Sequence, residues 1–336
     1  MREPAFWHRP SSWKSHLLRP LAALYGAVAA QRMRRDGLDA GIPVFCVGNY
    51  HVGGAGKTPT VLALAALMRE LDELPVVLSR GYGGRQRGPV KVDPNGHSAA
   101  DVGDEPLMMA ATLPVVIARD RADGVALARA QGASVILMDD GFQNPSVAKD
   151  ASLIVIDGTR GLGNGRVIPA GPLRAPLPPQ LARTDALIVV GEGNAAQKVA
   201  DRLASRGTPV LAAHLAPDAA SLAALRGKRV LAFAGIGDPA RFFNTLRSSG
   251  IDVVRSRVFA DHHPFTSDEI AQLVADAARD GLTLVTTEKD LARLRGTDGT
   301  EAIVPFAVTL QFEDAALLRR FVTDQLFKAR QRRLRS

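Results

Sequence analysis

At 336 residues, with 46% hydrophobic and 23% charged side chains, the chain has the composition of an ordinary globular protein and room for two domains. Its single cysteine, Cys46, excludes an internal disulfide framework and fits a reducing compartment. The net charge of +8 is concentrated near the two ends, where it suits either an anionic membrane surface or a solvated tail. An aromatic share of 5%, without a stacking platform, argues against nucleic acid as the partner.

The first 35 residues predict an amphipathic helix at a membrane interface. Both tryptophans lie here, and apolar residues follow at helical spacing before an arginine cluster: Trp7, Trp13, Leu17, Leu18, Leu21, Leu24, Tyr25, Val28, then Arg32, Arg34 and Arg35. Tryptophans suit the headgroup depth, leucines the layer below it, and arginines anionic lipid. The apolar part, residues 21–30, is far shorter than the ~20 residues that span a bilayer. A helix packed on the protein core remains the alternative.

Residues 43–59 predict a phosphate-binding loop. The apolar run at 44–47 indicates a buried strand, and a helix is expected from near Thr60. Between them lie the residues expected to bind the phosphates of a nucleotide: His51, Val52, Gly53, Gly54, Ala55, Gly56, Lys57 and Thr58. Glycines let backbone N–H groups surround an anion at a helix N-terminus, while Lys57 reaches the outer phosphates and the Thr58 hydroxyl ligates Mg²⁺. His51 replaces the first glycine of G-x-x-x-x-G-K-[ST], but strand, loop and helix keep the order that the motif requires.

Apolar runs alternate with helical patterns after this loop. Strands are expected at 44–47, 76–78, 115–117, 135–138, 153–156 and 187–190, and helices at 60–71, 106–111, 124–131 and 195–205. The alternation predicts an α/β fold of the P-loop NTPase type, with a mostly parallel sheet and helices on both faces.

A smaller α/β unit is expected after residues 211–226, where the periodicity weakens. Its strands are predicted at 230–234, 253–258, 283–286 and 303–309, and its helices at 241–248 and 268–280. Thr266 and Glu269 form a capping-box pattern ahead of the second helix. We therefore expect an interfacial helix in 1–35, a P-loop core in 36–220, the smaller unit in 221–313, and a helix with a basic tail in 314–336.

Asp139 and Asp140 end the predicted strand at 135–138. A carboxylate on a strand beside the phosphate loop is the expected holder of Mg²⁺. Adjacent residues of a strand point to opposite faces, so only one of the two aspartates is expected to face the metal directly.

Other polar residues at strand ends also suggest phosphate chemistry. Asp104 precedes a predicted helix, where it could cap the helix or accept a proton from a hydroxyl that attacks the γ-phosphate. Arg80, Arg119 and Arg121 follow strands and could neutralise a transferring phosphate or an acidic substrate. The pair at His262 and His263 lies in a predicted loop, where a surface turn is the simpler interpretation.

The order of these stretches resembles the tetraacyldisaccharide 4′-kinase family, the lipid A 4′-kinases of Gram-negative bacteria. The resemblance extends from residues 20–25 to 287–290 and includes 47–49, 53–59, 79–82, 103–106, 139–143, 160–163, 169–174 and 261–262. It implies a kinase that transfers the γ-phosphate of ATP, with Mg²⁺, to the 4′-hydroxyl of a tetraacylated glucosamine disaccharide 1-phosphate. It also implies a peripheral enzyme bound to anionic lipid at the cytoplasmic face of the inner membrane.

The resemblance assigns roles to residues that match the family's motifs. Asp104 is the expected catalytic base, assisted by His262, and Lys57 is expected at the phosphates. The metal site would comprise Thr58, Asp139, Asp140 and Glu105, and the substrate or phosphate contacts would come from Arg80, Arg119, Arg121, Gln143 and Arg174.

Three positions depart from the family pattern. His51 and Ala55 replace threonines, and both can still donate backbone N–H groups; Ala175 replaces a frequent glutamate, so any metal contact made by that glutamate is missing here. The rival interpretations are a membrane-bound P-loop ATPase switch, which would carry an extra lysine where Val52 stands, and a P-loop transferase with another substrate.

Overall fold

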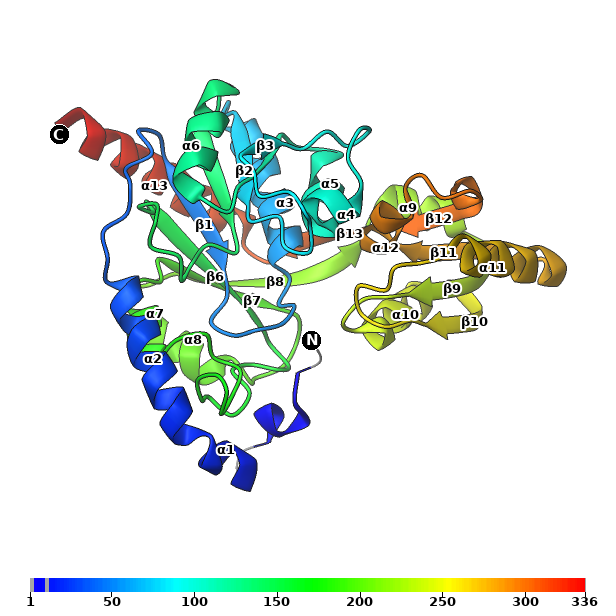
Figure 1. Ribbon diagram of the computed structural model, residues 1–336, viewed down its shortest axis with the longest axis horizontal. Helices are drawn as coiled ribbons and strands as arrows, with labels where there is room; N and C mark the ends of the chain where they lie inside the picture. The colour runs from blue at the N-terminus through cyan, green and yellow to red at the C-terminus, as the bar shows by residue number, and fades with distance from the viewer. Residues whose placement is uncertain (1–2, 10–11, 336) are drawn as a thin grey trace.

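The computed structural model describes residues 3–9 and 12–335; residues 1, 2, 10 and 11 of the expected N-terminal segment and residue 336 of the expected basic tail lie outside it. The described chain forms two α/β units, the larger at the left of Figure 1 and the smaller at the right. Strand order in the larger sheet is β13-β8-β7-β6-β1-β5-β2-β4-β3.

The larger sheet is mostly parallel, as predicted. Six of its strands were expected from the sequence: β1 (Val44–Gly48), β2 (Pro75–Ser79), β4 (Val115–Ile117), β5 (Val135–Asp139), β6 (Ala151–Asp157) and β7 (Ala186–Val190). Edge strands β3 (Val90–Lys91) and β13 (Val308–Phe312) pair antiparallel with their neighbours, and β8 (Val210–Pro217) pairs parallel with β7. Apolar side chains on both faces are buried, which explains why these strands appear in the sequence as continuous apolar runs.

Helices cover both faces of this sheet. Alternation along β1 sends Phe45 and Val47 to the face that carries α3 (Lys57–Glu70), α5 (Asp104–Ala110) and α13 (Ala315–Arg335). Val44 and Cys46 point to the other face, with α6 (Arg121–Ala130), α7 (Leu177–Leu181) and α8 (Gln197–Ala204). The one-turn helix α4 (Ala99–Val102) precedes α5. The central strand β1 is thereby sealed from water on both sides.

The smaller unit has its own four-stranded parallel sheet, in the order β10-β9-β11-β12. Its strands are β9 (Arg229–Ala234), β10 (Asp252–Val258), β11 (Thr283–Thr287) and β12 (Ile303–Phe306). Its helices are α9 (Ala219–Leu225), α10 (Pro239–Ser248), α11 (Ser267–Asp280) and α12 (Glu288–Leu294), with a 3₁₀ turn, η2 (Thr300–Ala302), before β12. The predicted capping box of Thr266 and Glu269 starts α11.

Residues 211–226 contain most of β8, which belongs to the larger sheet, and all of α9, which packs in the smaller unit, so the change from one unit to the other falls within this stretch. One expectation about the junction of the units was wrong. The strand expected at 303–309 is two strands in different sheets, β12 in the smaller sheet and β13 in the larger one. Between the two strands, Ala307 N donates to Ser221 Oγ, and Ala307 O accepts from Asp218 N. The backbone hydrogen bonds of β12 therefore do not continue into β13. The alternation of apolar residues does not indicate which sheet a strand joins. Because the chain changes sheets here, we propose that the smaller unit ends near Ala307.

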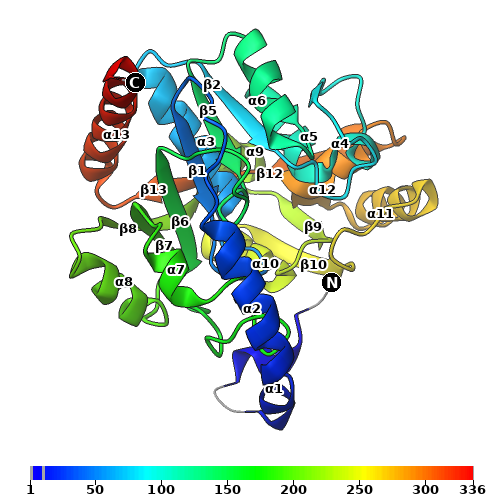
Figure 2. The same ribbon diagram turned by 60° about the vertical axis from the view of Figure 1, so that its left-hand side comes forward.

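The N-terminal segment lies along the outside of the larger unit (Figures 1 and 2). A 3₁₀ turn, η1 (Ala5–His8), and helices α1 (Trp13–Leu17) and α2 (Arg19–Met33) form it. It is attached by Trp7 Nε1, which donates to Pro169 O at 3.0 Å, and by Ser15 Oγ, which donates to Ala170 O at 2.6 Å. Several of its apolar side chains face outward, with exposed fractions of 72% for Trp13, 69% for Leu17 and 67% for Leu24. Trp7 is 8% exposed and packs on the protein, so the expectation that both tryptophans face the membrane interface was wrong for Trp7. No helix among the described residues is long and apolar enough to cross a membrane.

The C-terminal helix α13 packs on the larger unit through Leu318, Phe321 and Val322. Three arginines near its end pair with acids of the core: Arg330 with Glu73, Arg332 with Asp150, and Arg333 with Asp150 and Asp39. Much of the charge at this end is therefore neutralised within the fold.

Candidate active site

The phosphate loop joins β1 to α3 at the carboxyl edge of the larger sheet. Gly53 and Gly56 have φ angles of 105° and 92°, values that residues with a Cβ rarely adopt. Gly56 is the N-cap of α3, so the helix begins at Lys57, three residues earlier than the expected Thr60. Pro59 is tolerated there because the first helical turn needs no N–H donor. The loop therefore presents its backbone at a helix N-terminus, the geometry that binds anions.

Neighbouring side chains hold this loop in shape. Asn49 Nδ2 donates to Gly53 O at 3.1 Å, and Thr60 Oγ1 donates to Gly56 O at 2.9 Å. His51, at the position of the missing glycine, is 6% exposed, and its backbone bridges to Leu173. Burial lowers the pKa of the His51 imidazole, so its neutral form is favoured. Val52, Gly54 and Ala55 complete the loop.

Asp139 and Asp140 lie beside the loop because β5 pairs with β1. Asp139 is 3% exposed; Ser79 Oγ donates to its Oδ2 at 3.2 Å, while its Oδ1 is buried without a hydrogen-bond partner among the described residues. Burial, together with Glu105 and Asp140, raises the pKa of Asp139 to about 7. Asp140 has a φ of 50°, and its Oδ1 lies 3.7 Å from Lys57 Nζ and 2.6 Å from Arg174 Nη1. These two cations lower the pKa of Asp140 against the opposing effect of burial.

This donor set fits Mg²⁺ bound together with nucleotide. An orphaned buried carboxylate oxygen on Asp139 is what a cation would stabilise, and Thr58 supplies a hydroxyl at the loop. Within the described residues no group of three or more His, Cys, Asp or Glu side chains could hold a metal alone. Mg²⁺ normally takes one or two carboxylates and completes its shell with phosphate oxygens and water.

A second polar cluster forms where α5 meets the smaller unit. Asp104 is the first residue of α5, behind the N-cap Gly103, so it does not cap the helix. His262 Nδ1 and Arg293 Nε both lie 3.0 Å from Asp104 Oδ2, and Lys289 Nζ lies 3.7 Å from the same oxygen. Burial alone would raise the pKa of Asp104, but His262, Lys289 and Arg293 hold it well below its usual range. Asp104 is therefore an ionised acceptor.

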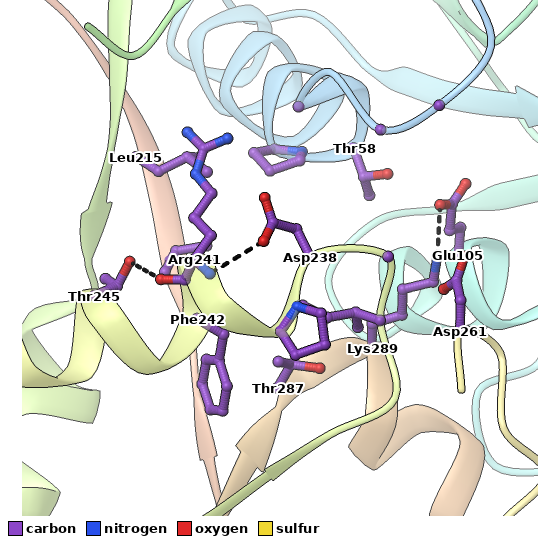
Figure 3. A pocket seen from close by; sticks show the side chains of 18 of the residues that line it. Thr58, Glu105, Leu215, Asp238, Arg241, Phe242, Thr245, Asp261, Thr287 and Lys289 are labelled. Atoms are coloured by element: carbon purple, nitrogen blue, oxygen red, sulfur yellow. Dashed lines mark hydrogen bonds and ion pairs between the residues drawn. The ribbon is translucent and has the colours of Figure 1, made fainter. Parts of the chain in front are cut away.

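Two cavities meet at the first turn of α5. The first, of about 1040 Å³, lies between the two units and is lined by loop residues, by Thr58, Glu105 and Lys289, and by Glu3 and His8 of the N-terminal segment. The second, of about 890 Å³, is lined by Arg80, Arg119, Asp104, His262 and Arg293. Figure 3 shows Thr58, Glu105 and Lys289 around the first cavity. Adjacent residues Glu105 and Asp104 thus reach opposite cavities.

Ion pairs also connect the two units on the side of the first cavity away from α5. Arg241 of α10 pairs with Asp157 at the end of β6, at 3.0 Å, and Arg160 pairs with Asp238 at 2.8 Å. On the near rim Lys289 Nζ lies 3.0 Å from Glu105 Oε1. Ion pairs therefore connect the two units on both sides of the first cavity.

The predicted substrate residues are distributed unevenly. Arg80 and Arg119 are exposed and line the second cavity, and Arg174 pairs with Asp140. Gln143 Nε2 donates to Asn49 O at 2.8 Å, which ties it to the base of the loop. Arg121 differs from the expectation: it is 2% exposed and donates back to Ala118 O, so it could act on a bound phosphate only through space.

Several site residues were not predicted from the sequence: Lys289, Arg293, Asp238 and Arg241. For Lys289, the available signal was the stretch 287–290, which ends the family resemblance, and Arg293 lies three residues beyond it. Thr287 caps α12 by accepting from Asp290 N at 3.1 Å. The helix that starts at this cap carries Lys289 and Arg293, which contact Glu105 and Asp104 of α5.

Together, the parallel sheet, the glycine loop at a helix N-terminus and the acidic neighbouring strand define a P-loop nucleotide-binding α/β protein. The family model described as Tetraacyldisaccharide-1-P 4′-kinase matches residues 14–326, and the chain belongs to this family.

Relatives and a solved structure agree with this assignment. Tetraacyldisaccharide 4′-kinases of Bradyrhizobium diazoefficiens and Nitrobacter winogradskyi are 70% and 67% identical, over 99% and 98% of this chain and 99% of each relative. A crystal structure of LpxK from Aquifex aeolicus in complex with ATP is similar at a TM-score of 0.73 and 27% identity, covering 93% of this chain and 99% of that one.

Proposed function

We propose that this protein is a kinase that transfers the γ-phosphate of ATP to the 4′-hydroxyl of a tetraacylated glucosamine disaccharide 1-phosphate, in lipid A biosynthesis. The observation that carries the proposal is the meeting of the phosphate-loop cavity and the Asp104–His262 cavity at the first turn of α5. Donor and acceptor can then approach from opposite sides of one helix end. Family membership and the ATP complex of the similar structure support it.

ATP would enter the first cavity, with its phosphates on the backbone of residues 51–58. Lys57 would neutralise the outer phosphates, a role supported by its position 3.7 Å from Asp140. Mg²⁺ would be held by Thr58, Asp139 or Asp140, and Glu105, and would supply neutralisation of charge on the phosphate oxygens. Arg174, now paired with Asp140, is near enough to share that task.

The acceptor sugar would occupy the second cavity, where Arg80 and Arg119 provide positive charge for its phosphate. Asp104 would accept the proton of the attacking hydroxyl. His262, Arg293 and Lys289 all approach Oδ2, which reserves Oδ1 for the substrate. The proton transfers late, as the bond to phosphorus forms, so a carboxylate of low pKa suffices and positioning supplies most of the rate.

The two-unit construction would keep water from the γ-phosphate. Ion pairs on both rims of the first cavity hold the units together over the nucleotide site. Excluding water strengthens the electrostatic interactions inside and suppresses hydrolysis of ATP. A kinase whose acceptor is a lipid needs this protection between turnovers.

We further propose that α1 and α2 lie on the cytoplasmic face of the inner membrane, bound to anionic lipid. Exposed apolar side chains on these helices would enter the interface, beside Arg32, Arg34 and Arg35. Replacing both Leu21 and Leu24, which are 58% and 67% exposed, by serine should weaken co-sedimentation with phosphatidylglycerol vesicles about tenfold or more. Leu74→Ser, which removes a leucine 65% exposed elsewhere, is the control. Equal binding of both variants would contradict the assignment.

Incubation with γ-labelled ATP and the disaccharide lipid tests the reaction itself. Label should appear on the lipid in the presence of Mg²⁺ and depend on a free 4′-hydroxyl. Release of labelled inorganic phosphate with none on the lipid would instead identify an ATPase switch.

A further inference from the structure

The guanidinium of Arg293 is the buried centre of the cluster around Asp104. Its side chain is 7% exposed, and Nε donates to Asp104 Oδ2 at 3.0 Å. Nη1 donates to Asp290 Oδ1 at 2.6 Å and to Gly235 O at 2.9 Å. Arg293 belongs to α12 of the smaller unit and Asp104 to α5 of the larger one, so this side chain joins the two units at the reacting group.

The partners of Arg293 are themselves fixed. Asp290 is fully buried and accepts from Gly235 N at 3.0 Å and from Thr287 Oγ1 at 2.8 Å. Burial raises the pKa of the Asp290 carboxyl, and Arg293 opposes this by favouring the charged form. A rigid anion and a rigid carbonyl thus determine where the guanidinium plane lies.

The same carbonyl also supports His262. Gly235 O accepts the backbone N–H of His262 at 3.0 Å, in addition to the bond from Arg293. His262 has a φ of 59°, an unfavourable conformation for a residue with a Cβ, which persists only when its surroundings hold it. Arg293 is therefore linked to both members of the Asp104–His262 pair: to Asp104 directly, and to His262 through one shared acceptor.

The guanidinium does not satisfy all of its own donors. Nη2 of Arg293 is buried and has no hydrogen-bond partner among the described residues. A buried donor without a hydrogen-bond partner destabilises the fold. The hydrogen bonds that Arg293 makes therefore do not by themselves explain why an arginine stands at this position. Its role in orienting the Asp104 carboxylate does explain it.

We propose that Arg293 is a positioning residue for the phosphoryl transfer, holding the Asp104 carboxylate and the His262 loop in the arrangement that receives the acceptor hydroxyl. The inference rests on the proposed function. Because Arg293 lies on the smaller unit, the base is aligned only when the units are closed. Arg293 lines the second cavity, with Asp104 and His262, so its loss should act on turnover rather than on ATP binding.

The test compares Arg293→Ala, Arg293→Lys and a control, Arg295→Gln, in label transfer to the disaccharide lipid. Arg295 also bridges the units, donating to Pro94 O at 2.6 Å, without contacting Asp104. Arg293→Ala should lower kcat about 100-fold, the cost of a misplaced reacting group, with the KM for ATP changed less than about twofold. Arg293→Lys keeps the charge without the fork of donors and should recover only part of kcat. The control should keep kcat.

A double-mutant cycle separates positioning from mere stability. In the Asp104→Ala background, Arg293→Ala should cause no further loss of kcat, because there is no carboxylate left to align. Multiplying losses would overturn the inference, and so would an Arg293→Ala enzyme with unchanged kcat. Thermal unfolding of each variant verifies the fold; if Arg293→Ala does not fold, the same cycle with Arg293→Lys decides. A wild-type enzyme that leaves the lipid unlabelled would refute the proposed function instead.

Discussion

The phosphate loop and the Asp104 cluster serve one reaction but are constructed differently. The loop consists of eight consecutive residues, 51–58, held by the strand before it and the helix after it. The cluster takes Asp104 from the larger unit and His262, Lys289 and Arg293 from the smaller one, more than 150 residues away along the chain. The first is complete within one unit, whereas the second exists only when both units are in contact.

In the proposed function, this difference assigns nucleotide binding to the larger unit and proton transfer to the contact between the two units. The backbone donors that would bind a triphosphate all lie within residues 51–58 of the larger unit. The base is aligned and its carboxylate kept ionised by cations from the other unit. In the proposed function, the catalytic group is complete only when the two units are in contact, an arrangement that would limit wasteful hydrolysis of ATP.

Removing the loop's cation should have the largest effect. Lys57→Ala should lower kcat/KM about 1000-fold or more, since the charge on the outer phosphates would no longer be neutralised. The fold should persist, because Lys57 pairs only loosely with Asp140, at 3.7 Å. Label transfer and thermal unfolding measure the two effects, with exposed Lys198→Ala as control. Undiminished turnover would remove the loop from the reaction.

Neutralising the base should have the next largest effect. Asp104→Asn should lower kcat about 100-fold, with little change in the KM for ATP, because the amide cannot accept the proton. Asp268→Asn, on the exposed first turn of α11, supplies a matched control. A rise in the KM for ATP equal to the loss of rate would mean that Asp104 serves nucleotide binding, and the contrast between the two regions would disappear.

Exchange of an ion pair on the rim should have the smallest effect. Arg160 and Asp238 are 42% and 38% exposed, so their pair is worth about 0.2–1 kcal/mol, and Arg160→Asp should lower kcat no more than about fivefold. The exchanged double variant, Arg160→Asp with Asp238→Arg, should recover most of that loss. Greater loss in the double variant than in either single one would show that the pair does not hold the cleft closed.

The sequence predicted structure correctly wherever that structure depends on a single short segment of the chain. The predicted loop, the six central strands and the capping box of α11 all depend on contacts within a few residues or on burial of whole apolar runs. The observed start of α3 is Lys57 rather than the predicted Thr60, because Gly56 is the N-cap and the first helical turn accommodates Pro59. For residues 287–290, the family resemblance included Lys289 but did not indicate that Lys289 contacts Glu105.

The sequence by itself determined that a phosphate loop lies between a buried strand and a helix, because glycine conformation, helix polarity and apolar periodicity are local properties. Only the tertiary structure decided that 303–306 and 308–312 belong to different sheets and that Arg121 turns inward. It alone brought Arg293 to Asp104, because contacts between distant segments depend on how two cores pack, and no short pattern encodes that.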